Sequence, residues 1–328
     1  MDARITKRRL SEMLQYDWVK IIGMVIVAIV VWELIFTVSA VRVKTGQNFK
    51  VYYYPTAAGA SGLYEFNDEK QPLSYDVLEF SIETLTTDYA DTILNTRLSI
   101  GEGDLIVVDN EISYPDDHKD DAMYAKSNLY NVVDNYTVAP LDVLNENAKN
   151  YLARFMENGE YEEDGSFLAD KVEENFVTRM KGDNRFRKEE NRAKGVAWEI
   201  ERLESLRAAT KEFSYLLDTV PELFLTYTKY QSAAHNRPSE DIQAAYEKQQ
   251  SHPYALDVEY LSQHQKEGVQ VIDIANNCAS EANWGTSKDV AVAAFDFTAD
   301  QPDLQYEIIV FLTALVRNYS TLLDSMPV

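Results

Sequence analysis

A long apolar run from Ile21 to Val41 constrains the fold of this chain more than any other feature of its sequence. About 20 consecutive apolar residues are needed for an α-helix to cross the ~30 Å hydrocarbon core of a bilayer. The run contains one charged residue, Glu33, and no proline. It therefore predicts one transmembrane helix (residues 21–41) between a short tail (residues 1–20) and a large domain (residues 42–328).

Basic residues on the two sides of the run predict its orientation. Five precede it and three follow it closely: Arg4, Lys7, Arg8, Arg9 and Lys20 before, and Arg42, Lys44 and Lys50 after. Cytoplasmic flanks of membrane helices carry the excess of Lys and Arg. We therefore expect a single-pass protein of the cell membrane, with a cytoplasmic N-terminus and an extracellular large domain.

A cleaved signal peptide is the alternative, because Val38-Ser39-Ala40 resembles a small-residue cleavage site. The apolar run is longer than the ~7–15 residues of a signal core, which favours an uncleaved anchor. Cys278, the only cysteine, lies far from the run, so a lipid-anchored lipoprotein is excluded. Glu33 either meets a partner helix inside the bilayer or reaches toward water, and its place in the outer half of the run favours water.

The acidic composition limits the partners of the large domain. The net charge is −23, with 54 acidic and 31 basic residues. Nucleic acids and anionic lipid head groups both require a basic surface, so the sequence predicts neither as a partner. One cysteine excludes an intrachain disulfide, and a domain of this length is large enough to be held by its core.

The first part of the large domain follows the pattern of an α/β sheet. The sequence predicts strands at 51–54, 76–86 and 104–109, and a helix at 89–100 with Asp88 as its N-cap. The glycines and polar residues of 59–74 predict a loop. The order strand, strand, helix, strand is typical of an α/β fold.

The second part mixes long amphipathic segments with short apolar ones. The predicted helices are 145–157, 187–217, 242–249 and 303–323, and the predicted extended segments are 252–257, 269–275 and 290–297. Residues 223–230 are predicted as a further short element.

Motifs of known catalytic or metal sites are missing from the sequence. It contains neither a glycine-rich phosphate loop nor a G-x-S-x-G elbow. The acidic stretches 116–121 and 160–165 lack the spacing of a calcium loop, with Lys171 where the second would need its last glutamate. The four histidines, His118, His235, His252 and His264, lie in polar stretches without paired metal spacing. We therefore expect a non-enzymatic protein without a metal or cofactor.

The block Val77–Tyr136 carries a family resemblance. Its matching residues are Asp88-Tyr89, Ile93, Leu98, Gly101-Glu102-Gly103-Asp104-Leu105-Ile106-Val107-Val108-Asp109 and the segment Ala125–Tyr136. This pattern resembles the N-terminal lobe of the extracellular solute-binding proteins of bacterial ABC importers. It departs from the family pattern where Gly103 adjoins Asp104 without an intervening proline, and in its membrane helix. The resemblance implies a periplasmic-binding-protein-like α/β domain with two lobes, preceded by a single transmembrane helix.

The resemblance also implies where a ligand binds. Open α/β sheets bind ligands at the carboxyl ends of their strands, which here carry Tyr54, Pro55, Asp109 and Asn110. Trp284, in the polar loop 276–288, is either a stacking platform for a sugar ring or an aromatic packed within its loop. The expected ligand is a small polar solute, sugar-like or peptide-like, delivered to an ABC-type permease.

A structural or assembly role is the alternative to solute capture. In it, the domain keeps the fold without the ligand site and docks onto a membrane complex. Glu33 and the long helix at 187–217 favour this alternative, whereas the strand-end residues favour solute binding.

Overall fold

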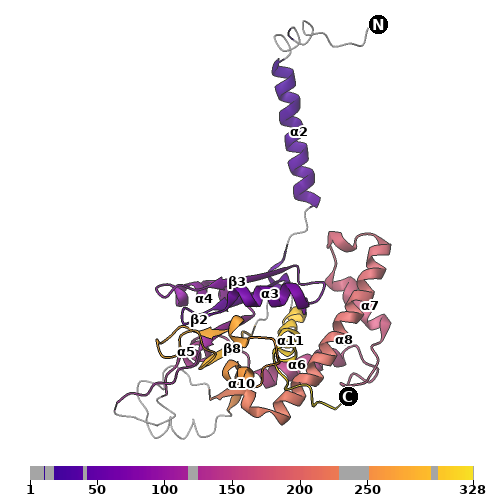
Figure 1. Cartoon of the computed structure of the whole chain (residues 1–328). Helices are drawn as coiled ribbons and strands as arrows, with labels where there is room; N and C mark the ends of the chain where they lie inside the picture. Colours follow the sequence, from indigo (N-terminus) through magenta and orange to yellow (C-terminus); the bar gives the residue numbers. More distant parts are fainter. Residues whose placement is uncertain are drawn as a thin grey trace, which may run out of the picture. The chain divides into compact units, whose positions relative to one another are not determined.

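The computed structural model describes residues 11, 18–39, 43–116, 125–228, 251–296 and 302–327 (Figure 1). They show a mixed α/β protein with a six-stranded sheet and one apolar helix near the N-terminus. By their internal contacts the residues divide into two compact units. One comprises Met1–Arg42 with Met180–Arg192, and the other comprises Val43–Arg179 with Ala193–Val328.

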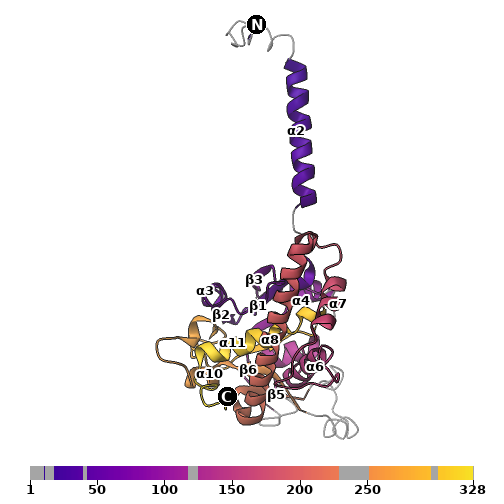
Figure 2. The same cartoon turned by 90° about the vertical axis from the view of Figure 1, so that its right-hand side faces the viewer.

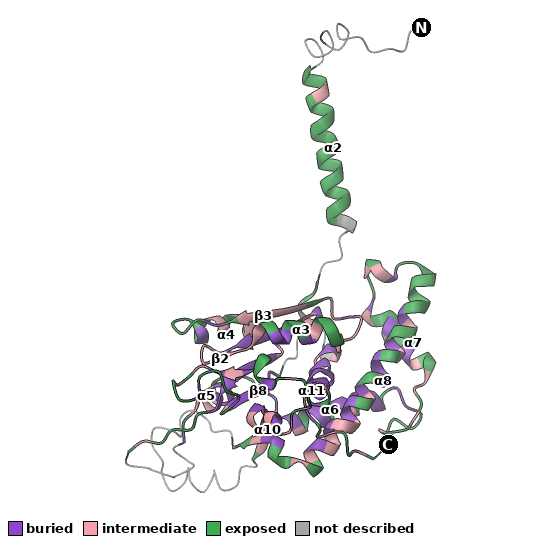
Figure 3. Ribbon diagram, viewed as in Figure 1, coloured by how far each residue is buried: buried purple, intermediate pink, exposed green. Residues whose placement is uncertain are grey.

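Helix α2, Trp18–Ser39, confirms the predicted apolar helix, displaced by two to three residues toward the N-terminus. Its 22 residues correspond to a length of about 33 Å. None of the window Trp18–Thr37 is buried, and Figure 3 shows this helix as exposed almost throughout. By length and composition it is the one described helix able to cross a membrane.

The main sheet has the strand order β3-β1-β4-β8-β6-β5. Its strands are β1 (Asn48–Tyr53), β3 (Glu79–Thr84), β4 (Leu105–Asp109), β5 (Phe224–Tyr227), β6 (His252–Asp257) and β8 (Val290–Ala294). Strand β1 pairs in parallel with both β3 and β4, while the pairs β4–β8, β8–β6 and β6–β5 are antiparallel. The carboxyl ends of β1, β3, β4 and β6 therefore lie at one edge of the sheet. A two-stranded sheet, β2 (Ala57–Ala58) with β7 (Asn276–Asn277), follows β1.

Both faces of the sheet are covered by helices. Along β1, Val51 and Tyr53 belong to one buried cluster and Tyr52 to another, as the alternation of a strand requires. The first cluster draws on α3, α6, α8 and α11, and the second on α4 and α5. These helices are α3 (Ala60–Lys70), α4 (Ala90–Ser99), α5 (Asn128–Asn135), α6 (Leu141–Ala153), α8 (Glu189–Thr219) and α11 (Glu307–Tyr319).

Two further α-helices and five 3₁₀ turns complete the described helical elements. They are α7 (Ala169–Arg179), α10 (Val258–Gln263) and the 3₁₀ turns η1 (Thr45–Gln47), η3 (Asn184–Phe186), η4 (Pro221–Leu223), η5 (Val271–Asp273) and η6 (Pro302–Leu304). Helix α11 is buried from Glu307 to Val316 and packs against α8, where Arg317 pairs with Glu212 at 2.7 Å (Figure 2). It is thus a central element of the core.

Most predicted elements are confirmed with shifted ends. Five predicted strands are present: β1 (predicted at 51–54), β3 (76–86), β4 (104–109), β6 (252–257) and β8 (290–297). Three predicted helices are present: α4 (predicted at 89–100), α8 (187–217) and α11 (303–323). The short element at 223–230 is β5, and the helix predicted at 145–157 is α6, which begins at Leu141. The helix predicted at 242–249 lies outside the described residues.

Three local predictions are wrong. Residues 60–70 of the predicted loop form α3, because Leu63 and Phe66 give the segment a buried face despite its polar composition. The strand predicted at 269–275 is instead the turn η5, whose backbone packs against α3. Asp88 is not the N-cap of α4, because the cap position is Tyr89 and has no side-chain hydrogen bond.

Candidate functional site

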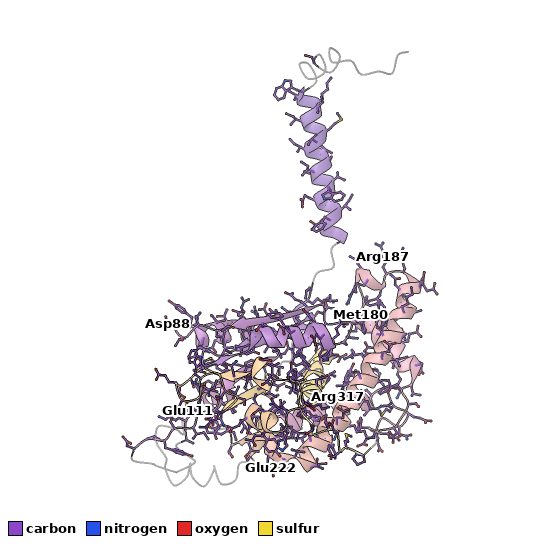
Figure 4. The ribbon with its side chains drawn as sticks, viewed as in Figure 1. Asp88, Glu111, Met180, Arg187, Glu222 and Arg317 are labelled. Carbon is purple, nitrogen blue, oxygen red and sulfur yellow. The ribbon has the colours of Figure 1, made fainter. Side chains whose placement is uncertain are left out.

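The candidate site lies where β1 and β4 end. The two strands are parallel neighbours, with Tyr53 opposite Val107. The backbone N–H of Tyr54 donates to the Val107 carbonyl at 2.9 Å, so the pairing extends one residue past β1. The topology therefore brings Tyr54-Pro55 and Asp109-Asn110 to the same edge. Figure 4 labels Glu111, which follows Asn110, at this end of the domain.

Asp109 is the centre of a hydrogen-bonded group at this edge. Its carboxyl group is buried, and its Oδ1 accepts hydrogen bonds from the Thr56 hydroxyl and, at 2.8 Å, from Asn128 Nδ2. Three elements thus meet on one oxygen: the segment after β1, the end of β4 and the start of α5. A carboxylate held in this way has a fixed orientation.

Asn110 connects the same strand end to two other segments. Its Oδ1 accepts a hydrogen bond from Ser127 Oγ at 2.8 Å, and its N–H donates to the Asp289 carbonyl at 2.6 Å. Ser127 is the N-cap of α5, where its Oγ also accepts from the Tyr130 N–H at 3.0 Å. The start of α5 is therefore fastened directly to the end of β4.

Two phenols border this group. Burial raises the pKa of Tyr54, the charges of Asp91 and Asp109 raise it further, and a hydrogen bond with the Asn131 side chain opposes the rise. Burial and the hydrogen bond that Tyr136 donates to Asp91 at 2.8 Å raise the pKa of Tyr136. Both phenols are therefore neutral at physiological pH and keep their hydroxyl protons for hydrogen bonding.

A cavity of about 280 Å³ adjoins these residues along α5. We call the interacting side chains at the ends of β1 and β4 the strand-end group; they are Tyr54, Thr56, Asp109, Asn110, Ser127, Asn128 and Asn131. Ser127 and Asn131 also line the cavity. The remaining wall is polar as well as aromatic: Ala125, Lys126, Tyr130, Asp134 and Asn135. The Tyr130 ring stacks on Tyr227 at 4.2 Å between centroids, and Tyr227 donates its hydroxyl proton to Asp134 at 2.9 Å. Such a cavity offers donors and acceptors to a small polar molecule.

Trp284 lies on the loop between β7 and β8. The residue is 67% exposed, so its ring is accessible to solvent. The neighbouring Asn283 donates to Asp289 Oδ2 at 3.2 Å, and Asp289 in turn accepts from Asn110. The loop is thus attached to the strand-end group by its backbone and by Asn283.

Sequence reasoning missed the contribution of α5. Thr56 lies two residues after the predicted strand 51–54, whereas Ser127, Asn128 and Asn131 belong to α5 and its N-cap, 17 or more residues farther along the chain than Asn110. A signal was present, since Ser127 precedes the apolar positions Leu129, Val132 and Val133 as an N-cap would.

A buried ionic network forms a second polar centre that the sequence did not predict. Glu199 on α8 lies between two guanidinium groups, those of Arg179 and Arg202, and its Oε1 is 2.8 Å from Arg202 Nη2. Arg179 also pairs with Asp76 at 2.6 Å, and Arg202 Nη1 lies 3.5 Å from Glu307 Oε1. All five side chains are at most 8% exposed.

The two glutamates of this network respond differently to burial. For Glu199, burial favours the neutral form, but Arg202 and Arg179 together outweigh it, and the pKa falls below its ordinary value. For Glu307, burial outweighs the more distant Arg202, and the pKa is raised. Glu199 is therefore a fully compensated carboxylate, whereas Glu307 is not.

Each histidine in the described residues has its Nδ1 close to one oxygen atom. His252 Nδ1 lies 2.8 Å from Asp142 Oδ2, and His264 Nδ1 lies 3.0 Å from the Tyr260 carbonyl. His118 and His235 lie outside the described residues. Burial raises the pKa of the Cys278 thiol, which keeps it protonated. Within the described ranges, no group of three His, Cys, Asp or Glu residues is placed to hold a metal ion.

Comparison with protein-family models, curated proteins and solved structures finds no match to this chain. The resemblance of Val77–Tyr136 to solute-binding proteins therefore remains a prediction from those residues.

Proposed function

We propose that this chain is a membrane-anchored binding protein whose large domain captures a small polar solute outside the cell. The observation that carries the proposal is the group of hydroxyl, amide and carboxyl side chains at the carboxyl ends of β1 and β4, next to a cavity of about 280 Å³. Open α/β sheets bind their ligands at this edge. Polar groups held in advance lose little conformational freedom when a ligand binds.

The proposal includes the family relationship and its two-lobed fold. The resembling block forms the consecutive elements β3, α4, β4 and α5 of the main sheet. Gly103 has φ +129°, and a Cβ there would lie 2.6 Å from the Tyr52 ring, which supports its role as the glycine between helix and strand. In this proposal the six-stranded sheet corresponds to the first lobe, and its carboxyl edge faces the solute.

The membrane helix supports the anchored part of the proposal. Helix α2 is long and apolar enough to cross a bilayer. Anchoring would hold the binding domain close to a membrane permease of the ABC type, the expected recipient of the solute.

A thermal unfolding screen of the full chain in detergent tests the proposal. The probes are sugars, amino acids, short peptides and divalent ions, each at millimolar concentration. We expect one of the first three classes to raise the melting temperature by several degrees, because a ligand that binds only the folded state stabilises it. The substitution Asn131→Ala removes an amide from the cavity wall and should abolish the shift. Asn158→Ala, at an exposed position away from the cavity, should leave it intact.

A folded chain that no probe stabilises would contradict the proposal. It would favour the assembly role, in which the domain docks onto a membrane complex. Co-purification of a stoichiometric partner from detergent would then be the decisive observation.

A further inference from the structure

A second cavity lies at the opposite edge of the main sheet. Its volume is about 250 Å³, and it is formed where the segment Gln71–Tyr75, which precedes β3, meets α8 and α11. The residues that matter for its chemistry are Ser74, Tyr75, Trp198, Glu201, Arg202 and Glu307. The solute site proposed above lies beyond the carboxyl ends of the strands, whereas this cavity precedes β3. The two sites share none of these residues.

One wall of the cavity is aromatic. The Trp198 side chain is 43% exposed, and its ring centroid lies 5.8 Å from that of Tyr75 at an interplanar angle of 39°. The Tyr75 hydroxyl donates to Glu199 at 2.7 Å, which fixes the orientation of the Tyr75 ring. A partly exposed indole ring beside carboxyl groups attracts organic cations.

The floor of the cavity is the outer end of the ionic network. Arg202 lines it, but its guanidinium group pairs closely with Glu199 and bonds the Tyr151 hydroxyl. Glu307 is 2% exposed, and its Oε2 accepts the Ser74 N–H at 3.1 Å. Its Oε1 lies 3.5 Å from Arg202, farther than the 2.7–2.9 Å of a strong charge-assisted hydrogen bond. Oε1 therefore keeps the capacity to accept a stronger donor.

The charges around the cavity do not balance. Of the residues that line it, Arg202 carries the one positive charge and Glu307 carries a carboxyl group. Glu201, which also lines the cavity, adds a further negative charge at its exposed rim. A cation is the ligand that compensates this excess.

We propose that this cavity binds the ammonium group of a small organic cation. The ammonium group donates to Glu307 Oε1 and lies against the face of Trp198, with Glu201 at the entrance. The alkyl part of the ligand contacts Pro72 and Val310, which also line the cavity. A small inorganic ion fits less well, because Mg²⁺ and Ca²⁺ need at least six oxygen ligands and gain nothing from an indole face.

Ligand-observed NMR titration of the full chain in detergent, at 150 mM salt, tests this proposal. The probe is n-butylammonium, and n-butyrate is the control of equal size and opposite charge. Saturable binding of n-butylammonium without binding of n-butyrate is the expected result. Tetramethylammonium, which cannot donate a hydrogen bond, should bind more weakly if Glu307 accepts from the ligand.

Two exposed positions provide variants that keep the core intact. Trp198→Ala removes the aromatic wall and Glu201→Gln removes the charge at the entrance, so each should raise the dissociation constant about fivefold or more. Glu222→Gln removes another exposed carboxyl group, beyond the end of α8 and away from the cavity, and should have no effect (Figure 4).

Three results would overturn the proposal. They are equal binding of n-butyrate, a loss of binding in Glu222→Gln as large as in Glu201→Gln, and the absence of saturable binding. Since Asn131→Ala disables only the strand-end cavity, it should leave n-butylammonium binding unchanged. Failure of this inference is thereby distinguished from failure of the solute-binding proposal.

Discussion

At the scale of single residues, Glu199 shows how the same helix uses charge in opposite ways. Its side chain is fully buried, while Glu201, two positions later, is exposed. Arg202 then returns to the buried side, one turn from Glu199. Burial of three carboxylates and two arginines is tolerated only because each meets an opposite charge.

The first prediction concerns the ion pairs of Glu199 with Arg179 and Arg202. Glu199→Ala leaves the guanidinium groups of Arg179 and Arg202 without their shared partner in a buried site. We expect the free energy of unfolding to fall by about 3–5 kcal/mol. Urea denaturation of the full chain in detergent measures it. Arg317→Ala breaks the exposed pair with Glu212 and should cost less than about 1 kcal/mol. Equal losses in the two variants would contradict the argument.

The second prediction concerns pH and Asp104. Burial raises the pKa of the Asp104 carboxyl group from 3.8 to about 7, against a hydrogen bond from the Lys50 N–H at 2.7 Å. Because the folded-state pKa is raised, the unfolded chain loses this proton first. The contribution of Asp104 to stability is therefore lost progressively as the pH rises from about 4 to about 7, and it is constant above that range.

Asp104→Asn isolates this effect, because an amide oxygen still accepts the Lys50 hydrogen bond but does not titrate. We compare denaturation midpoints of the two chains at pH 5 and pH 8. Between pH 5 and pH 8, the free energy of unfolding of the parent chain should fall by about 1–2 kcal/mol relative to that of the variant. This is less than the full pKa shift of Asp104 implies, because solvent reaches part of its side chain. A difference that is constant with pH, or that has the opposite sign, would refute the raised pKa.

At the scale of elements, α3 and η5 both differ from the structure predicted for them, and they lie in close contact. The polar composition of α3 favours a loop, and the apolar residues of η5 favour a strand. Helix α3 buries Leu63 and Phe66, and its backbone at Gly62 lies close to that of η5. A Cβ on Gly62 would lie 2.1 Å from the Asp273 carbonyl oxygen. Local patterns do not contain such a contact between segments more than 200 residues apart.

The third prediction follows from this contact. Alanine favours a helix over glycine by about 1 kcal/mol, yet Gly62→Ala should destabilise the domain by about 1–3 kcal/mol. The added methyl group would collide with backbone atoms that η5 holds in place. Thermal unfolding of the full chain checks this. Ser61→Ala, at an exposed position of the same helix, should be neutral or slightly stabilising.

Elements with strong local patterns were predictable, and their partners were not. The continuous apolar residues of Leu105–Val108 predict a buried strand. In the structure all five residues of Leu105–Asp109 are buried. The insertion of β8 between β4 and β6, antiparallel to both, depends on contacts between distant segments. The position of Asp109 and Asn110 at a strand end follows from the strand that precedes them in the sequence. The approach of Ser127 and Asn128, at the start of α5, to these two residues depends on a contact between distant segments and was not predictable.

At the scale of the whole molecule, one described helix is long and apolar enough to cross a membrane. The helix was predictable from the sequence, because its length and its few charged residues are what make it a candidate membrane span. Its orientation depends on the flanking basic residues, and the proposed solute capture requires the large domain to lie outside the cell.

The fourth prediction tests that orientation. In chains with Cys278→Ala, we place one cysteine at Ser11 or at Glu163, both exposed positions. A membrane-impermeant maleimide applied to intact cells should label the cysteine at 163, and that at 11 only after lysis. Replacement of the basic cluster Lys7–Arg9 by glutamates removes most of the positive charge before the helix, so part of the population should insert the other way and show the reverse labelling.

Labelling at position 11 in intact cells of the parent chain would place the large domain in the cytoplasm. An extracellular solute would then be out of its reach, although the fold and both cavities would be unchanged.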